Sequence, residues 1–381
     1  MVERSPHKTL VMKFGGTSVG SVEAMTQVIE IIKQCRSDWP RLVVVASALN
    51  GVTNLLLDTA SRSELGDRQA YLAAVEELTQ RHFSMIDALA GDAAMTTAPD
   101  AALLKAEISR IIDDFGARCQ AIGVLSEATP RALDAIAGMG EQMSARILAA
   151  ALVSAGVPAQ AIDATELIVT DECFQSAHPD MAATTLRTRE KLEPILAQGE
   201  VAVVTGFIGA TPAGVTTTLG RGGSDYSAAV VGAALPADDV WIWTDVDGVM
   251  TADPRLVPSA RTIPVLSYRE ISELAYYGAK VLHPKTIRPV IEAGIGLRVC
   301  NTFNPQQPGT RLVSELPAPA TGVIKAVTAI RGLQLITIEG RGMLGVPGVA
   351  ARTFGAVAAT GTSVPLISQA SSEQSICFAV P

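Results

Sequence analysis

The chain has 381 residues, enough for roughly two or three domains, and 48% of them are hydrophobic while only 18% are charged. A disordered chain is therefore excluded. The formal net charge is −8, and no run of Lys or Arg offsets it, so a basic nucleic-acid-binding protein is excluded and no nucleic-acid partner is expected.

Short apolar runs alternate with helical patterns along most of the chain. Continuous apolar runs predict buried strands at Thr9–Lys13, Arg41–Ala48, Glu200–Gly206 and Val240–Thr244. Helical periodicity predicts helices at Val22–Gln34, within Arg68–Gly123, and at Met139–Ala155, Ser224–Ala234, Tyr268–Gly278 and Val281–Gly294. This alternation predicts an α/β layered domain with a mainly parallel sheet, whose ligands bind beyond the carboxyl ends of the strands.

A Pro-rich stretch, residues 304–322, predicts a linker to a second, smaller unit. The expected division is therefore residues 1–303, the linker, and residues 323–381. The second unit is predicted to hold strands at Leu333–Glu339, Ser363–Ser368 and Gln374–Val380, and a helix at Gly348–Thr360.

The five cysteines are far apart without a CxxC pair, and the four histidines lack metal-ligand spacing. We therefore expect a cytoplasmic protein without disulfides or a zinc centre. The apolar run Leu10–Met12 is too short for a signal peptide, and no stretch of about 18 apolar residues could span a membrane.

The loop after the first predicted strand favours phosphate binding over an ordinary turn. Gly15 and Gly16 let the backbone approach an anion, Lys13 adds a full charge, and Thr17 and Ser18 add hydroxyls. The loop is not a Walker A motif, because no Gly-Lys-Ser/Thr closes it.

A second loop, Gly-Arg-Gly-Gly-Ser-Asp, opens a predicted helix. Its helix N-terminal amides, at Gly222, Gly223 and Ser224, suit an oxyanion or a phosphate. Arg221 suits a carboxylate, and Asp225 either orders nearby cations or is only a helix N-terminal charge.

Five further residues are candidates with competing interpretations. Asp245 and Asp247 could bind Mg²⁺ or ribose hydroxyls, but taken alone an Asx turn is favoured. Arg255 could contact phosphate oxygens, and Lys280 is either a solvated charge or a functional group. Glu141 is either a helix N-terminal acid or a partner for a substrate ammonium.

Together these segments closely resemble the aspartate kinases of the amino-acid kinase family. The matching segments, in family order over roughly residues 9–305, are VMKFGGTSVGS, VVVASALNGVTNLL, GEQMSARIL, TLGRGGSDYSA, WTDVDGVMTADPR and YGAKVLHPKTI. The resemblance implies a three-layer α/β/α sandwich whose N-terminal half binds L-aspartate and whose C-terminal half binds ATP, with Mg²⁺ held mainly through ATP. The implied products are 4-phospho-L-aspartate and ADP, at the entry to lysine, threonine, methionine and isoleucine synthesis.

The resemblance also implies residue roles. Lys13, Asp225 and Lys280 would be catalytic: Lys13 neutralises the transferring phosphoryl group, and Asp225 organises the cations. Aspartate binding is implied for Ser47, Thr53, Glu141, Arg221, Gly222, Gly223 and Ser224. ATP binding is implied for Lys13, Gly15, Gly16, Thr17, Ser18, Thr244, Asp245, Asp247, Met250, Arg255 and Lys280. Met250 stands where relatives often have Tyr, which argues against a stacking or hydroxyl contact there.

The second unit contains a GxGxxG match, Gly340–Gly345, between a predicted strand and helix. A dinucleotide site is disfavoured, because the next strand ends without an acid and only about 36 residues remain. The segment instead resembles the start of an ACT domain, a module that binds end-product amino acids and pairs between units. The implied effector residues are Gly345, Val346, Pro347, Gly348, Val349, Ala350, Gln369, Ser371, Ser372 and Glu373.

This ACT-like segment supplies only βαββ of a βαββαβ module. We therefore expect a fragment of a longer aspartate kinase, or of one fused to homoserine dehydrogenase, with weak or absent inhibition by threonine or lysine. A homo-oligomer, dimer or tetramer, is expected through this region. The alternatives are a kinase acting on glutamate, N-acetylglutamate or a nucleotide, a non-catalytic amino-acid sensor, or a module that only packs.

Overall fold

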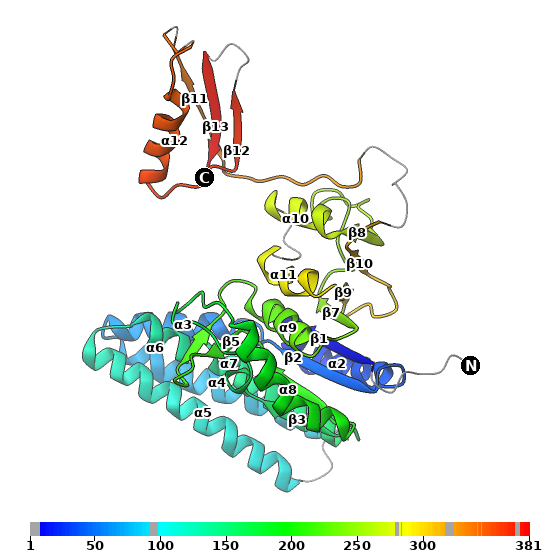
Figure 1. The fold of residues 1–381 in the computed structure, drawn as a ribbon. Coiled ribbons are helices and arrows are strands. Elements are labelled where there is room, and N and C mark those ends of the chain that lie inside the picture. Colours follow the sequence, from blue (N-terminus) through cyan, green and yellow to red (C-terminus); the bar gives the residue numbers. More distant parts are fainter. Residues whose placement is uncertain are drawn as a thin grey trace. The chain divides into compact units, whose positions relative to one another are not determined.

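The structure, a computed structural model, describes residues 8–91, 98–278, 282, 284–316, 324–340, 342–343, 345–369 and 374–381. The chain divides into two compact units, with the boundary between Val327 and Thr328. The first unit contains a mainly parallel sheet flanked by helices, and the second a small antiparallel sheet (Figure 1). The predicted fold class is confirmed.

An eight-stranded sheet forms the middle of the first unit, in the order β3-β4-β2-β1-β7-β9-β10-β8. Its strands are β1 (Thr9–Phe14), β2 (Arg41–Ala46), β3 (Ala159–Ile162), β4 (Val201–Thr205), β7 (Asp239–Thr244), β8 (Val265–Ser267), β9 (Gly296–Asn301) and β10 (Thr310–Val313). All neighbours pair in parallel except β9 and β10. A separate hairpin joins β5 (Ile208–Ala210) to β6 (Thr216–Thr218).

Side-chain alternation on the strands divides the core into two layers. Leu10 and Met12 of β1 belong to one buried cluster and Val11 to the other, as successive side chains of a strand point to opposite faces. The first cluster includes residues of the helices α2 (Val22–Cys35), α3 (Val52–Glu64), α4 (Arg68–Gly91), α5 (Ala98–Leu125) and α7 (Met139–Ser154). The second includes residues of α8 (Met181–Ala197), α9 (Gly223–Ala234), α10 (Tyr268–Tyr276) and α11 (Pro284–Glu292). The sheet is therefore the middle layer of three.

Among the described residues, three short helices complete the first unit. They are α1 (Gly16–Val19), α6 (Pro130–Ala137) and the 3₁₀ helix η1 (Ala164–Glu166). No helix in the described part of the chain is both long and apolar enough to cross a bilayer.

The parallel pairing places the polar loops of the first unit at one edge of the sheet. Phe14, the last residue of β1, is paired with Ala46 on β2 and with Trp243 on β7. Ala46 is in turn paired with Thr205 on β4. The loops that follow these strands therefore lie side by side, as sheets of this kind require of a binding site.

The expected linker differs from the structure in one part. Residues 310–313 form β10, which pairs with β8 and β9. Thr310 and Leu312 are both fully buried, so this short alternating segment completes the sheet although prolines flank it. Beyond it, the Lys325 ammonium forms a 2.6 Å ion pair with Glu270 of α10.

The second unit has the predicted βαββ order. It comprises β11 (Gln334–Glu339), α12 (Val349–Ala359), β12 (Leu366–Gln369) and β13 (Ser375–Val380), with β13 in the middle of the sheet. Ile376, Phe378 and Val380 form its small core, where the Phe378 ring lies 5.5 Å from the ring of Phe354. Because every pairing is antiparallel, the GxGxxG match does not belong to a dinucleotide fold.

Candidate active site

A cavity of about 580 Å³ opens beyond the carboxyl ends of β1, β2 and β4. Ten of the residues predicted from the sequence line it: Lys13, Gly16, Ser47, Thr53, Glu141, Arg221, Gly222, Gly223, Ser224 and Asp225. All the residues expected to bind aspartate therefore line this cavity.

Glu141 is a deeply buried charged group of this cavity. Helix α7 approaches the loop after β2 closely because residue 140 is glycine: a Cβ there would lie 2.7 Å from the Ala48 Cβ. The Glu141 side chain is 3% exposed, and its Oε2 has no hydrogen-bond partner among the described residues. Burial raises the pKa of Glu141 from 4.5 to about 8, partly offset by the backbone amides of Ala48 and Glu141 and by Lys13. The cavity is thus built to receive a positive group at this carboxylate.

Lys13 and Asp225 form an ion pair across the cavity, with 2.6 Å between Nζ and Oδ1. Lys13 is next to last on β1, and Asp225 lies in the first turn of α9. Both side chains are less than one fifth exposed, so the carboxylate holds the ammonium in a fixed position with little screening by solvent.

Helix α9 begins inside the cavity wall at Gly222. This residue is the N-cap with φ of 71°, a left-handed conformation that glycine adopts without a Cβ penalty, and no side chain in the described part of the chain caps the helix. The first amides of α9 therefore remain available to an anion. The exposed Arg221 precedes them and also lines the cavity.

The loop after β2 supplies the opposite wall. The Ser47 amide donates to the Phe14 carbonyl at 3.1 Å, and the Ser144 hydroxyl donates to the Ser47 carbonyl. These bonds fix the loop between β1 and α7. Thr53, in the first turn of α3, is half-buried and faces the same space.

The cavity residues that the sequence reasoning missed include Asp134, Gln175 and Thr218. Asp134 is buried and accepts hydrogen bonds from the amides of Gln175 and Thr218, both at 2.9 Å, and from the Thr218 hydroxyl at 2.8 Å. Burial raises the pKa of Asp134, although these three donors lower it. Asp134 could have been identified from the sequence as an acidic residue on the otherwise apolar face of the short helix α6.

Three residues expected on the nucleotide side, Thr244, Asp245 and Asp247, lie at or just after the carboxyl end of β7. The Asp247 Oδ1 accepts from the side-chain amides of Asn301, at 2.7 Å, and Asn304, at 3.2 Å. The Thr244 hydroxyl donates to Asp245 at 3.1 Å, and Asp245 is exposed. Because β7 and β9 are parallel neighbours, these oxygen atoms collect at the same edge as the cavity.

The other residues predicted to bind the nucleotide differ in their surroundings. The Gly15 amide donates to the Trp243 carbonyl at 3.2 Å, and Ser18 is buried against the Thr302 hydroxyl at 2.7 Å. Ser18 is thus a packing residue in this structure, whereas Thr17 is exposed. The sulfur of Met250 accepts from the Thr262 hydroxyl at 3.4 Å.

Arg255 is largely exposed and pairs with Asp253 at 2.8 Å, away from the cavity. Lys280 lies outside the described residues, as do Ser371, Ser372 and Glu373 of the expected effector segment. In the second unit, Gly345 and Gly348 have φ values of 69° and 86°, and Gly348 caps α12.

Comparison with protein families matches residues 8–301 to the amino acid kinase family and residues 336–381 to an ACT domain. The chain belongs to the amino acid kinase family.

Relatives of this chain include aspartokinases. The bifunctional aspartokinase/homoserine dehydrogenase 1 of Zea mays is 39% identical over 97% of the chain, which spans 40% of the maize protein's length. The lysine-sensitive aspartokinase 3 of Escherichia coli is 35% identical over 94% of the chain and 75% of that protein.

A solved structure gives the same result. The crystal structure of E. coli aspartokinase III in complex with aspartate and ADP matches with a TM-score of 0.82 and 32% identity, over 98% of this chain and 78% of that one. The resemblance recognised in the sequence is therefore confirmed for the fold and the family.

Proposed function

We propose that this chain transfers the γ-phosphoryl group of ATP to the side-chain carboxylate of L-aspartate, forming 4-phospho-L-aspartate and ADP. This reaction would be the first step in the synthesis of lysine, threonine, methionine and isoleucine. The observation that carries the proposal is a buried oxygen of Glu141 that has no hydrogen-bond partner among the described residues, in a cavity that Arg221 and Lys13 also line.

Glu141 and Arg221 recognise the two charges that every free α-amino acid carries. A substrate ammonium at Glu141 would restore the ionised carboxylate that burial disfavours, while Arg221 binds the α-carboxylate through two parallel hydrogen bonds. An N-acetylated amino acid has no ammonium and would leave the Glu141 oxygen buried and unpaired. The cavity therefore favours aspartate or glutamate over N-acetylglutamate.

Lys13 and Asp225 act on the transferred group. The aspartate side chain is already ionised near neutral pH, so one of its oxygens attacks the γ-phosphorus without a general base. The bond from that phosphorus to the β–γ bridging oxygen breaks, and its electron pair leaves with ADP. Lys13, held by Asp225 at 2.6 Å, neutralises the charge on the phosphoryl oxygens.

The loops after β1 and β7 would hold ATP. The proposed contacts are Gly15, Gly16, Thr17, Ser18, Thr244, Asp245, Asp247, Met250, Arg255 and Lys280. The carboxylate, hydroxyl and amide oxygens near Asp247 are donors that suit Mg²⁺, and no group of three carboxylates gathers there among the described residues. This fits an ion held mainly by the nucleotide, where it offsets the charge on the β- and γ-phosphates.

The second unit would bind a feedback amino acid, such as lysine or threonine, and pair with another copy. The relative from E. coli named lysine-sensitive supports an amino-acid effector. Leu335, Leu366 and Ile367, on β11 and β12, are each more than half exposed, which suits contact with a second copy. We place the enzyme in the cytoplasm because all five cysteines are free thiols.

Hydroxylamine trapping tests the activity. The purified chain is incubated with ATP, Mg²⁺ and hydroxylamine, with L-aspartate, L-glutamate or N-acetyl-L-glutamate as acceptor. We expect the hydroxamate only with L-aspartate, and none from the Lys13→Ala variant. A hydroxamate formed with glutamate and not with aspartate would overturn the substrate assignment, and none with any acceptor would overturn the kinase assignment.

A further inference from the structure

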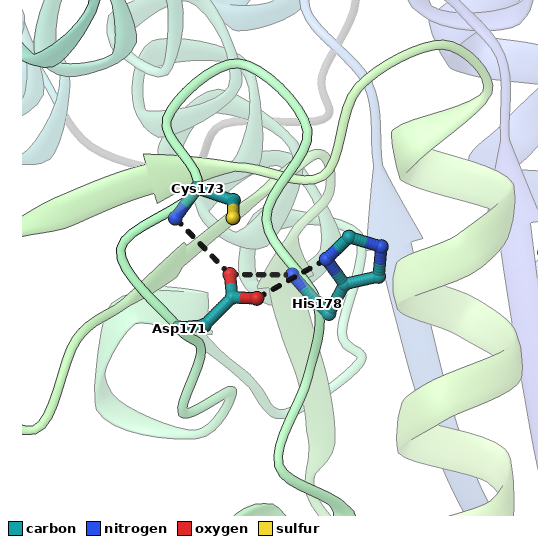
Figure 2. A group of neighbouring side chains, drawn as sticks. All are labelled: Asp171, Cys173 and His178. Carbon is teal, nitrogen blue, oxygen red and sulfur yellow. Dashed lines mark hydrogen bonds and ion pairs between the residues drawn. The ribbon is translucent and has the colours of Figure 1, made fainter.

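A loop next to the cavity gathers three side chains of different chemistry. Asp171, Cys173 and His178 are all exposed, and one ligand atom from each lies within 4.8 Å of the other two (Figure 2). The Asp171 Oδ2 is 3.1 Å from the His178 Nδ1. None of these residues is part of the proposed phosphoryl-transfer machinery.

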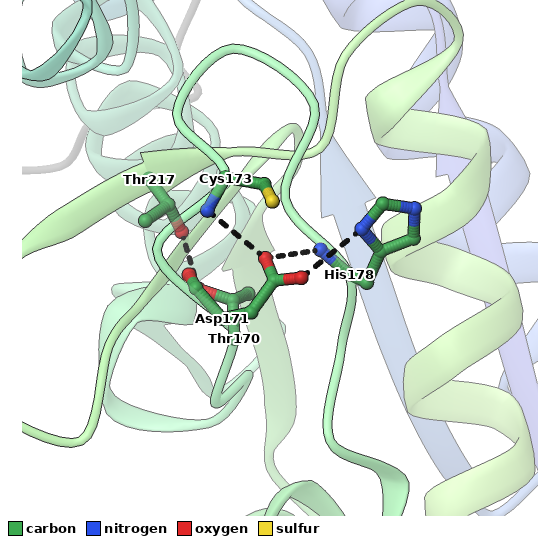
Figure 3. Close-up of polar contacts among 5 residues, drawn as sticks. All are labelled: Thr170, Asp171, Cys173, His178 and Thr217. Carbon is green, nitrogen blue, oxygen red and sulfur yellow. Dashed lines mark hydrogen bonds and ion pairs between the residues drawn. The ribbon is translucent and has the colours of Figure 1, made fainter.

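The loop that holds them is fixed at its base. Thr170 and Pro179 form an antiparallel bridge, and the Thr170 hydroxyl lies 2.7 Å from the buried Thr217 hydroxyl (Figure 3). The Thr170 amide donates to the Ala210 carbonyl at 2.9 Å, which ties the loop to β5. The two ends of the loop are therefore held together on rigid elements.

Asp171 also fixes the backbone around the other two side chains. Its Oδ1 accepts from the amides of Cys173, at 3.2 Å, and His178, at 2.9 Å, and its own amide donates to the His178 carbonyl at 3.1 Å. One carboxylate oxygen thus orders the loop while the other faces the imidazole. A ligand set ordered in this way loses little conformational entropy when it binds an ion.

We propose that Asp171, Cys173 and His178 form a binding site for a thiophilic divalent transition-metal ion, with Zn²⁺ as the fitting ion and water as the fourth ligand. Thiolate, imidazole and carboxylate are the ligands that Zn²⁺ takes, whereas Mg²⁺ and Ca²⁺ prefer oxygen alone. Tetrahedral Zn²⁺ requires a sulfur-to-nitrogen separation of about 3.6 Å. The three ligand atoms lie within 4.8 Å of one another, so the sulfur-to-nitrogen separation exceeds this value by about 1.2 Å at most, which rotation of the Cys173 side chain can supply. On binding, the Cys173 thiol releases its proton to solvent and the imidazole binds through a neutral nitrogen.

The site is connected to the cavity through one residue of the same loop. Gln175 lies between Cys173 and His178, lines the cavity, and donates its amide to the buried Asp134. Its carbonyl also lies 3.1 Å from the position that a Cβ on Gly220 would take. An ion bound to both Cys173 and His178 therefore restrains the segment between them, including Gln175 in the cavity wall, and this part of the inference rests on the proposed function.

Metal binding is measured on the full chain with Co²⁺ as a spectroscopic probe and Zn²⁺ as its competitor. We expect one Co²⁺ per chain with a thiolate-to-cobalt charge-transfer band that Zn²⁺ removes. The Cys173→Ser and His178→Gln variants should bind at least about tenfold more weakly. Cys377→Ser, which alters a thiol of the second unit, is the matched control and should bind as the wild type does. Asp171 is not substituted, because its loss would also release the loop backbone.

The absence of a charge-transfer band in the wild-type chain, or an equal band in Cys173→Ser, would overturn the site. Thermal melting of each variant shows that the fold is kept. The link to the cavity is measured separately, as the KM for aspartate with and without Zn²⁺. We expect a change of at least about threefold in the wild type and none in Cys173→Ser; an equal KM in the wild type would overturn the link. Metal binding does not depend on turnover, so failure of the kinase proposal would leave the binding result intact.

Discussion

Replacing Glu141 by glutamine is expected to stabilise the ligand-free chain at alkaline pH while removing its affinity for aspartate. The amide has nearly the shape of the carboxyl group but carries no charge, so it escapes the cost of burying an ion. The same substitution removes the group that receives the substrate ammonium. Stability and binding should therefore change in opposite directions.

The size of the effect follows from the raised pKa of Glu141. Below about pH 4.5 the carboxyl is protonated in both the folded and the unfolded chain and costs nothing. As the pH rises from 4.5 to about 8, the folded chain binds more protons than the unfolded chain, so the wild-type free energy of unfolding falls. Each pKa unit corresponds to about 1.4 kcal/mol, so the ionised group costs on the order of 5 kcal/mol at most above pH 8.

Thermal melting across a pH series measures this cost. With about 2 °C per kcal/mol for a unit of this size, the Glu141→Gln variant should melt at nearly the wild-type temperature at about pH 5 and up to roughly 10 °C higher at about pH 9. Glu30→Gln, on the exposed surface of α2, is the control and should show no such trend. A melting difference that does not change with pH would refute the assignment of a buried, proton-binding carboxyl.

Binding gives the second readout for the same variant. Removing one partner of a buried ion pair costs about 3 to 5 kcal/mol, so the KM for aspartate should rise at least about a hundredfold. In the wild type this KM should fall as the pH rises toward about 8, because the substrate ammonium binds the ionised carboxylate. Unchanged KM in the variant would exclude Glu141 from substrate binding.

Three further substitutions follow from the geometry. Lys13→Ala should lower kcat by at least about a hundredfold with the fold intact, because the charge held by Asp225 is lost; wild-type turnover of the purified variant would disprove this role. Gly140→Ala should lower the free energy of unfolding by about 1 to 3 kcal/mol, since the new Cβ would overlap Ala48. A denaturant titration with an unchanged midpoint would contradict this and show that α7 can shift freely. Asp134→Asn should cost about 1 to 3 kcal/mol, because one oxygen that accepts a hydrogen bond becomes a donor. For this last variant, circular dichroism melts equal to those of the wild type would contradict the hydrogen-bond network.

For the aspartate half of the candidate site, local signals in the sequence indicated only some residues. Lys13 stands near the end of an apolar strand and Arg221 in a glycine-rich loop before a helix, whereas Ser47 and Thr53 were expected only from the resemblance to aspartate kinases. Glu141 was predicted as a candidate, but its burial depends on how closely α7 packs against the loop after β2. The closeness of this packing depends on tertiary contacts, so it cannot be predicted from the short segment around Glu141.

The parts missed from the sequence depend on contacts between distant segments. Gln175 enters the cavity because its amide reaches Asp134, 41 positions earlier. Strand β9 was overlooked because Arg298 interrupts its apolar run, yet the guanidinium carbon of that arginine lies 5.1 Å from the centre of the Trp241 ring. Cys173 and His178, the ligands that we propose for a metal ion, show no spacing pattern in the sequence, since a loop and not a regular element brings them together.

The central place of β1 in the sheet has a consequence for synthesis of the chain. Its partners are β2, made soon afterwards, and β7, which ends at Thr244, about 200 residues after β2. At about 5 to 20 residues per second, the ribosome takes roughly 10 to 40 s to supply the second partner. During that interval Leu10, Val11 and Met12, which are fully buried in the finished sheet, stand along an open strand edge. Folding of this chain is therefore governed by contacts of high sequence separation, and the nascent chain depends on protection of its first strand until the sheet can close.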